Sequence, residues 1–211
     1  MLYDLSKLRR IAFCDPAGSK TGREKLKRTS ARSAIVVIGV DDLIRIFVLH
    51  AWADRCSTDI LMNKIQSLNE LFQPKIFGME ANAMQSLFAD AVAREAKRLQ
   101  KRLPLVPVTQ PTKIEKNWRI RTNLQSVVAD GRLFVQENQL ELQAELSAFP
   151  MSPTVDIIDA LSSAVALAPR RAVQQARQSE FDALADYLRR SGATPFQIQK
   201  RIAELREGVA A

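Results

Sequence analysis

The stretch RIAFCDPAGS (residues 10–19) decides the fold that we expect for this chain. Its apolar run, residues 11–14, is too short for a stable helix and is closed by proline and glycine, so it predicts a buried strand. That strand carries Asp15 to the edge of a sheet. An aspartate before a proline is a common start for a turn, but at a sheet edge it is also well placed to hold a metal ion or a proton.

The composition indicates a globular protein with an anionic partner. Hydrophobic residues make up 46% of the 211 residues, which is enough for one domain with a core plus an appendage. Lysine and arginine number 31 against 23 aspartate and glutamate, which gives a formal charge of +8. Such a balance favours a polyanion such as nucleic acid as the partner.

The cysteines and the apolar runs indicate the compartment. Cys14 and Cys56 match neither a disulfide framework nor a zinc site, which fits a reducing environment. No apolar run approaches membrane-spanning length, and the start of the chain lacks the hydrophobic core of a signal peptide. We therefore expect a cytosolic protein.

The segments after the first strand predict a mixed α/β fold. Residues 34–40 form a continuous β-branched run, and residues 43–50 form a second run of strand character after a turn. Together with the first strand they predict an antiparallel meander. The later segments predict helices from residue 82, over 113–130 and through 146, and strands over 105–109 and 132–135.

A crossover brings a second carboxylate to the sheet edge. Ser57 or Thr58 can cap a helix that Pro74 stops, and the short strand that follows ends on Glu80. Two strands joined by a crossover helix run parallel, so their carboxyl ends meet at one edge. We therefore expect Glu80 to lie beside Asp15.

A third carboxylate site lies in TVDIIDALSSAVALA, residues 154–168. Ser152 and Pro153 predict the start of a helix there. Asp156 and Asp159 are three residues apart and project from one face of its first turns. Acids in the first turn suit the helix dipole, but an acid on the buried side of an apolar helix is costly unless a metal or a partner neutralises it.

These four acids, Asp15, Glu80, Asp156 and Asp159, predict a divalent-metal site. Clustered carboxylates repel one another, and Mg²⁺ or Mn²⁺, which prefer oxygen ligands, would neutralise them. Two such ions about 4 Å apart hydrolyse phosphodiesters by activating a water and stabilising the leaving oxygen. Glycoside hydrolysis also uses paired acids, but it needs neither a third acid nor the strong positive charge.

Basic residues cluster beside the first strand and in the helix 113–130. Such runs are often merely solvated, but here they lie next to the candidate site, so we expect contact with DNA phosphates. The fragment GSKTG lacks the Walker spacing and is not expected to bind a nucleotide. Trp118 lies among these basic residues and could stack on a base, although burial in the core is the preferred interpretation. The expected DNA-binding residues are Lys20, Arg23, Lys25, Lys27, Arg28, Lys113, Lys116 and Arg119.

The order of these features resembles a known nuclease superfamily. A strand ending on Asp, a meander, a strand ending on Glu and a late DxxDA helix are similar to the ribonuclease H-like nucleases. Within them, residues 10–168 resemble the nuclease domain of tailed-bacteriophage terminase large subunits. The motifs that carry this resemblance are K-x-x-R-I at residues 116–120, DGRLF at 130–134, Phe149-Pro150 and DIIDAL at 156–161.

The resemblance implies a fold, an activity and partners. The fold would be a ribonuclease H-like mixed sheet of five or slightly more strands flanked by helices. Asp15, Glu80 and Asp159 would bind two Mg²⁺ or Mn²⁺ ions, with Asp156 where relatives carry a second acid or a histidine. The activity would be endonucleolytic cleavage of concatemeric double-stranded viral DNA in the bacterial cytoplasm. The partners would be a packaging ATPase domain or subunit, the portal and the small terminase subunit.

Two alternatives remain open. Terminases carry a packaging ATPase, whereas this chain has no Walker A sequence, so it is either an excised domain or a separate nuclease subunit. A Holliday-junction resolvase has the same acids, and a non-catalytic DNA-binding or assembly module would keep the fold without the chemistry.

We expect the chain to divide into a nuclease domain, residues 1–168, and a helical C-terminal extension, residues 169–211, which either packs on that domain or docks a packaging partner.

Overall fold

The computed structural model describes residues 5–17, 32–81, 84–110, 114–168 and 182–208. The chain forms two compact units. The first consists of Met1–Asp41 with Arg45–Ala168, and the second of Asp42–Ile44 with Pro169–Ala211.

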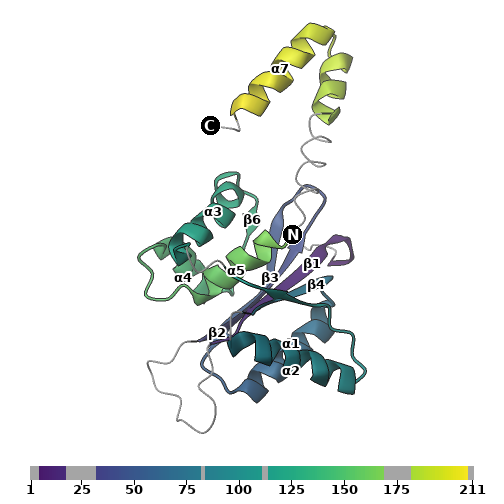
Figure 1. Cartoon of the computed structure of the whole chain (residues 1–211). Coiled ribbons are helices and arrows are strands. Elements are labelled where there is room, and N and C mark those ends of the chain that lie inside the picture. Colours follow the sequence, from purple (N-terminus) through teal and green to yellow (C-terminus); the bar gives the residue numbers. More distant parts are fainter. Residues whose placement is uncertain (1–4, 18–31, 82–83, 111–113, 169–181, 209–211) are drawn as a thin grey trace. The chain divides into compact units, whose positions relative to one another are not determined.

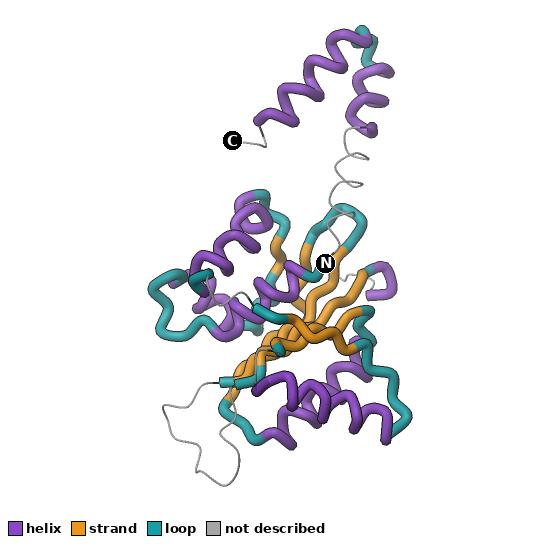
Figure 2. Tube along the Cα trace, in the orientation of Figure 1, coloured by secondary structure: helices purple, strands orange, loops and turns teal. Residues whose placement is uncertain are grey.

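The first unit is built on a mixed six-stranded sheet (Figures 1 and 2). Its strand order is β5-β4-β1-β2-β3-β6. The first three strands form an antiparallel meander, whereas β4 runs parallel to β1, β5 parallel to β4, and β6 parallel to β3. The strands are β1 (Arg9–Asp15), β2 (Ser33–Val40), β3 (Ile46–Asp54), β4 (Ile76–Glu80), β5 (Leu105–Val108) and β6 (Leu133–Phe134).

Helices cover both faces of this sheet. Helices α1 and α2 lie on one face, and α3, α4 and α5 lie on the other, with α5 packed across β1, β2 and β3 (Figure 1). Both faces of β2 are buried, which explains its run of β-branched residues without polar alternation. The helices of this unit, after a short 3₁₀ turn at Leu5–Lys7, are α1 (Thr58–Phe72), α2 (Met84–Arg98), α3 (Lys116–Ala129), α4 (Leu140–Ala148) and α5 (Asp156–Ala166).

Alternation along β1 assigns its side chains to the two faces. Ala12 and Cys14 pack in the core beneath α1 and α2, together with Ile65 and Phe77. The intervening residues of β1 therefore face α5. Phe13 is fully buried there, and Asp15, two residues further along, lies on the same face.

The expected mixed α/β sheet flanked by helices is confirmed, with six strands, but several boundaries were wrong. The helix expected over 113–130 spans Lys116–Ala129. The expected strand 43–50 starts at Ile46 and runs to Asp54. A turn precedes it, in which Asp41 accepts a hydrogen bond from the Arg45 backbone N–H at 2.8 Å. The helix expected to start at Ser152 and Pro153 begins at Asp156 instead, with no side-chain cap from the residue before it.

The second unit is helical in its described part. It contains a helix over residues 182–190 and α7 (Pro195–Gly208). Thr194 and Gln197 form a capping box at the start of α7, with the Gln197 N–H donating to the Thr194 hydroxyl at 3.3 Å and the Thr194 N–H donating to the Gln197 side chain at 2.9 Å. Within the described residues, no helix combines the length and the apolar character needed to span a bilayer.

Candidate metal centre

Two of the predicted acids lie at the same edge of the sheet. In the parallel β1–β4 pair, Cys14 is opposite Met79, so Asp15 and Glu80 are the next residues in the same register. Both follow the alternation that points away from α1 and α2, and both are half-buried. The expectation that the crossover places Glu80 beside Asp15 on adjacent parallel strands is confirmed.

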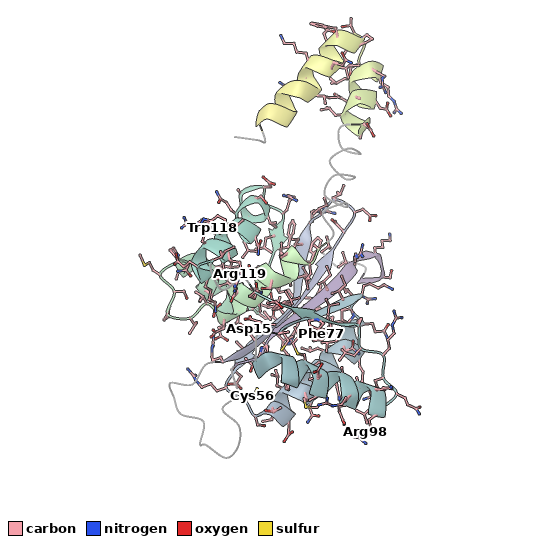
Figure 3. The ribbon with its side chains drawn as sticks, in the orientation of Figure 1. Asp15, Cys56, Phe77, Arg98, Trp118 and Arg119 are labelled. Carbon is pink, nitrogen blue, oxygen red and sulfur yellow. The ribbon has the colours of Figure 1, made fainter. Side chains whose placement is uncertain are left out.

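Helix α5 brings the third acid over these strand ends. Asp159 lies in its first turn and is only 3% exposed. Close packing at the C-terminal end of α5 sets the distance between the helix and the sheet. An added Cβ on Gly78 of β4 would lie 2.4 Å from the side chain of Leu167, the residue that caps α5. The same Cβ would lie 2.7 Å from the buried ring of Phe13, so glycine allows this approach without displacing either side chain. In Figure 3, the labelled side chains of Asp15 and Arg119 lie close to α5.

Asp15 lies within electrostatic range of both other acids, Glu80 and Asp159. Burial, then the negative charges of Glu80 and Asp159, raise the pKa of Asp15 from 3.8 to about 8. A hydrogen bond with Glu80 also raises this pKa, whereas the positive charge of Lys116 lowers it. At neutral pH, Asp15 therefore holds a proton in the metal-free protein, which relieves the repulsion among these carboxylates.

Two cations from α3 neutralise Asp159. Arg119 Nη2 donates to both carboxylate oxygens, at 2.7 and 2.8 Å, and Lys116 Nζ lies 3.2 Å from Oδ2. Lys116 Nζ is also 3.9 Å from Asp156 Oδ1, so the two acids of α5 share this cation. Arg119 Nε is buried and has no hydrogen-bond partner among the described residues. The pairing explains how an almost fully buried carboxylate is tolerated on an apolar helix.

A further ion network holds the start of α5, and the sequence analysis did not assign it to the site. Arg32, just before β2, donates to Asp156 at 2.9 Å and to Glu145 at 3.0 Å, and it also pairs with Glu141. Burial alone would lower the pKa of Arg32, but hydrogen bonds to Glu141 and Asp156 raise it, so the guanidinium stays charged. Glu145 is 1% exposed and accepts a hydrogen bond from the Ile158 backbone N–H at 2.9 Å.

One buried and one half-buried side-chain amide hold α5 from its sides. Gln110, just after β5, donates to the Ser163 hydroxyl at 2.9 Å, and Asn123 of α3 donates to the Ser162 hydroxyl at 3.1 Å. Both serines are buried. The helix that carries Asp156 and Asp159 is therefore held by polar contacts from four places: the residue before β2, the loop after β5, α3 and α4.

The donor set fits a hard divalent cation. Asp15, Glu80 and Asp159 supply only carboxylate oxygens, the ligands that Mg²⁺ and Mn²⁺ prefer, and their mutual repulsion is what a cation would relieve. In the described part of the chain, no three acidic, histidine or cysteine side chains are already arranged around a common point that could hold a metal. Asp159 turns its oxygens to Arg119 and Lys116 instead, so metal binding requires that these ion pairs be exchanged.

The expected DNA-binding residues divide into two groups. Lys116 and Arg119 point at the acids of α5, and their contact with DNA stays a prediction. The preferred interpretation of Trp118 was wrong, because its side chain is 59% exposed on α3 rather than buried in the core (Figure 3). The predicted residues that lie outside the described part of the chain are Lys20, Arg23, Lys25, Lys27, Arg28 and Lys113.

Comparison with known proteins gives similarities of structure but none of sequence. No protein-family profile and no curated protein sequence matches the chain. The nuclease domain of the P22 large terminase is 10% identical, with a TM-score of 0.49 over 74% of this chain and 79% of that one. T. thermophilus RuvC, in a complex with a Holliday junction substrate, is 13% identical, with a TM-score of 0.43 over 74% of this chain and 90% of that one. A pre-cleavage Mos1 transpososome is 13% identical, with a TM-score of 0.32 over 80% of this chain and 55% of that one.

Proposed function

We propose that this chain is a divalent-metal-dependent endonuclease of the ribonuclease H-like superfamily that cleaves double-stranded DNA. The observation that carries the proposal is the placement of Glu80 and Asp159 around Asp15, since burial and then these two negative charges raise the pKa of Asp15 to about 8. A fold gains nothing in stability from placing three acids together at a sheet edge, whereas a metal site requires it. The formal charge of +8 favours nucleic acid as the substrate.

The acids and cations of the site have separate roles in this proposal. Asp15, Glu80 and Asp159 would hold one or two Mg²⁺ or Mn²⁺ ions, with Asp156 at the side of the site. The bound metal would supply an activated water and stabilise the leaving oxygen of a phosphodiester. Asp15 would lose its proton on binding the cation, because the positive charge lowers a pKa that burial and the two neighbouring carboxylates had raised.

Lys116 and Arg119 are positioning residues in the metal-free protein. They hold the carboxylate of Asp159 in place and balance its negative charge on a buried helix. If Asp159 were engaged as a metal ligand, Lys116 and Arg119 would be free beside the site to pair with a DNA phosphate. The same two side chains thus stabilise the empty centre and are then available to bind the substrate backbone.

We further propose that the biological substrate is concatemeric viral DNA that is cut during genome packaging. This rests on the sequence resemblance of residues 10–168 to terminase nuclease domains. The reaction would take place in the bacterial cytoplasm, with a packaging ATPase domain or subunit, the portal and the small terminase subunit as partners. Residues 169–211 would be an extension of the nuclease domain.

The proposal is tested by incubating the purified full chain with supercoiled plasmid, linear duplex and a four-way junction, in Mg²⁺, Mn²⁺ or EDTA. We expect metal-dependent cleavage of plasmid and linear duplex that is lost in Glu80→Ala. Glu137→Ala, which removes an exposed glutamate after β6, is the matched control and should keep full activity.

The substrates separate the alternatives. Cleavage restricted to the four-way junction would replace the terminase assignment with a resolvase. Cleavage that persists in Glu80→Ala would come from a contaminant or from another site. No cleavage of any substrate in either metal would contradict the nuclease and favour a DNA-binding or assembly module.

A further inference from the structure

A second charged site lies at the opposite end of the β1–β4 pair. A cavity of about 360 Å³ opens there, between the starts of the two strands and the ends of α1 and α2. Four cationic side chains line it, together with the single acid Glu70 and two side-chain amides. The cationic residues are Arg10, Lys75, Lys101 and Arg102.

This cavity is separate from the metal centre. Arg10 shares the alternation of Ala12 and Cys14, so it faces α1 and α2, whereas Asp15 faces α5. Five residues of extended strand separate Arg10 from Asp15, a distance of about 16 Å along β1. The cavity therefore lies on the other face and at the other end of the strands from the acids.

Hydrogen bonds fix the backbone that carries these cations. The Lys75 N–H donates to the Arg10 carbonyl at 2.8 Å, which joins the starts of β1 and β4. The buried side chain of Asn69 donates to the Arg102 carbonyl at 2.8 Å, which ties the end of α1 to the loop between α2 and β5. Figure 2 shows the loops that join these helices to the strands. The cationic side chains thus project from a rigid frame.

The balance of charge in the cavity favours an anion. Glu70 pairs with Lys101, which leaves Arg10, Lys75 and Arg102 without an ion-pair partner among the described residues. The ends of α1 and α2 each add about half a negative charge, which accounts for part of this excess. About two positive charges remain uncompensated after both helix ends are included. Helix-end complementarity alone therefore does not explain the cluster.

We propose that this cavity binds a phosphate group. Arginine and lysine provide charge-assisted donors that suit phosphate oxygens, and the side-chain amides of Asn69 and Gln73 line the same cavity. Its volume falls at the lower end of the range of small-molecule sites, which start at roughly 300 Å³. The phosphate belongs either to a free nucleotide or to the backbone of a nucleic acid strand.

The test is calorimetric titration of the full chain with inorganic phosphate and with ATP, in EDTA so that no cleavage occurs. We expect saturable binding that is weakened at least about tenfold in the double variant Lys75→Gln/Arg102→Gln, because two charge-assisted hydrogen bonds are lost. Arg98→Gln removes an arginine at the end of α2 that does not line the cavity, and it should bind like the wild type (Figure 3). Equal melting temperatures of the variants and the wild type show that each is folded.

The titrations also identify the source of the phosphate. ATP binding tighter than inorganic phosphate indicates a nucleotide, whereas equal binding that a short DNA duplex displaces indicates a nucleic acid backbone. Absence of saturable binding, or binding that is unchanged in Lys75→Gln/Arg102→Gln, overturns the proposal. Because the titration requires neither metal nor cleavage, its outcome is independent of the proposed nuclease.

Discussion

Replacing Asp15 by asparagine should make the metal-free protein more stable, and increasingly so as the pH rises. The pKa of Asp15 is about 8 in the folded protein, against 3.8 for the unperturbed group. Between these values the folded protein holds a proton that the unfolded chain has lost, so stability falls as the pH rises through this window. The asparagine side chain of the Asp15→Asn variant would not ionise, and its amide could donate to Glu80 as the protonated aspartate does.

The size of the effect follows from the pKa. One pKa unit corresponds to about 1.36 kcal/mol, so a shift of about four units sets an upper limit of roughly 5 to 6 kcal/mol. Asp15 is half-buried, and water near its oxygens screens part of the repulsion, so we expect a gain of about 2 kcal/mol near pH 8. For a chain of this length, that raises the melting temperature by roughly 4 to 8 °C.

The assay is thermal and urea unfolding in EDTA, monitored by circular dichroism. It is run at about pH 5 and about pH 8, near the two ends of the window between the unfolded and folded pKa values of Asp15. Asp90→Asn removes an exposed acid from α2 and controls for the loss of one negative charge. The gain of Asp15→Asn over wild type should at least halve at the lower pH. An Asp15→Asn protein that is no more stable than wild type near pH 8, or whose gain does not change with pH, would refute the convergence of the acids.

Three further predictions concern the surroundings of the site. Glu145→Ala should lower the free energy of unfolding by about 3 kcal/mol in urea titrations, because it leaves the charge of Arg32 and the Ile158 N–H without a buried partner. Glu145→Gln keeps an acceptor oxygen and should therefore lower the free energy of unfolding by less. Arg119→Gln should tighten Mn²⁺ binding severalfold in calorimetry, because the guanidinium competes with the metal for Asp159; weaker binding would show that Arg119 supports the metal-bound state. Trp118→Ala should change the free energy of unfolding by less than about 0.5 kcal/mol, whereas Ile120→Ala on the same helix should lower it by about 2 to 4 kcal/mol. A large loss of stability in Trp118→Ala would mean that the tryptophan side chain is packed against the protein.

The part of the site that lies on strands could be predicted from the sequence. An apolar run that ends on an acid defines both the strand and the position of its last side chain, and this places Asp15 and Glu80 at one sheet edge once the crossover is recognised. Asp159 could also be singled out, because an acid within an apolar helix needs a partner. Each of these inferences depends on local pattern and on one topological rule.

The ion network around α5 could not be predicted in the same way. Arg32 and Glu145 are separated by more than a hundred residues, and only the packed fold brings them together. A local signal for Glu145 exists, since it lies three residues after the buried Leu142 on one face of α4. Its contact with the Ile158 N–H also explains why the predicted helix start at Ser152 was wrong, because α5 obtains an acceptor for its first turn from another helix.

The exposure of Trp118 could have been inferred from the helical pattern. The buried positions of α3 are Ile120, Leu124 and Val127. Trp118 precedes the first of them by two residues, which is roughly 200° around the helix axis. Residue type alone favours burial of tryptophan, but helical position decided the outcome here.

The most direct measurement of the central claim is anomalous diffraction from crystals of the full chain soaked in Mn²⁺. We predict a strong anomalous peak bounded by Asp15, Glu80 and Asp159, with Arg119 displaced from the carboxylate of Asp159. The crystals must leave the acids accessible to solvent. If they do, the absence of a peak at this position, with Arg119 still paired with Asp159, would contradict the metal centre and with it the proposed nuclease.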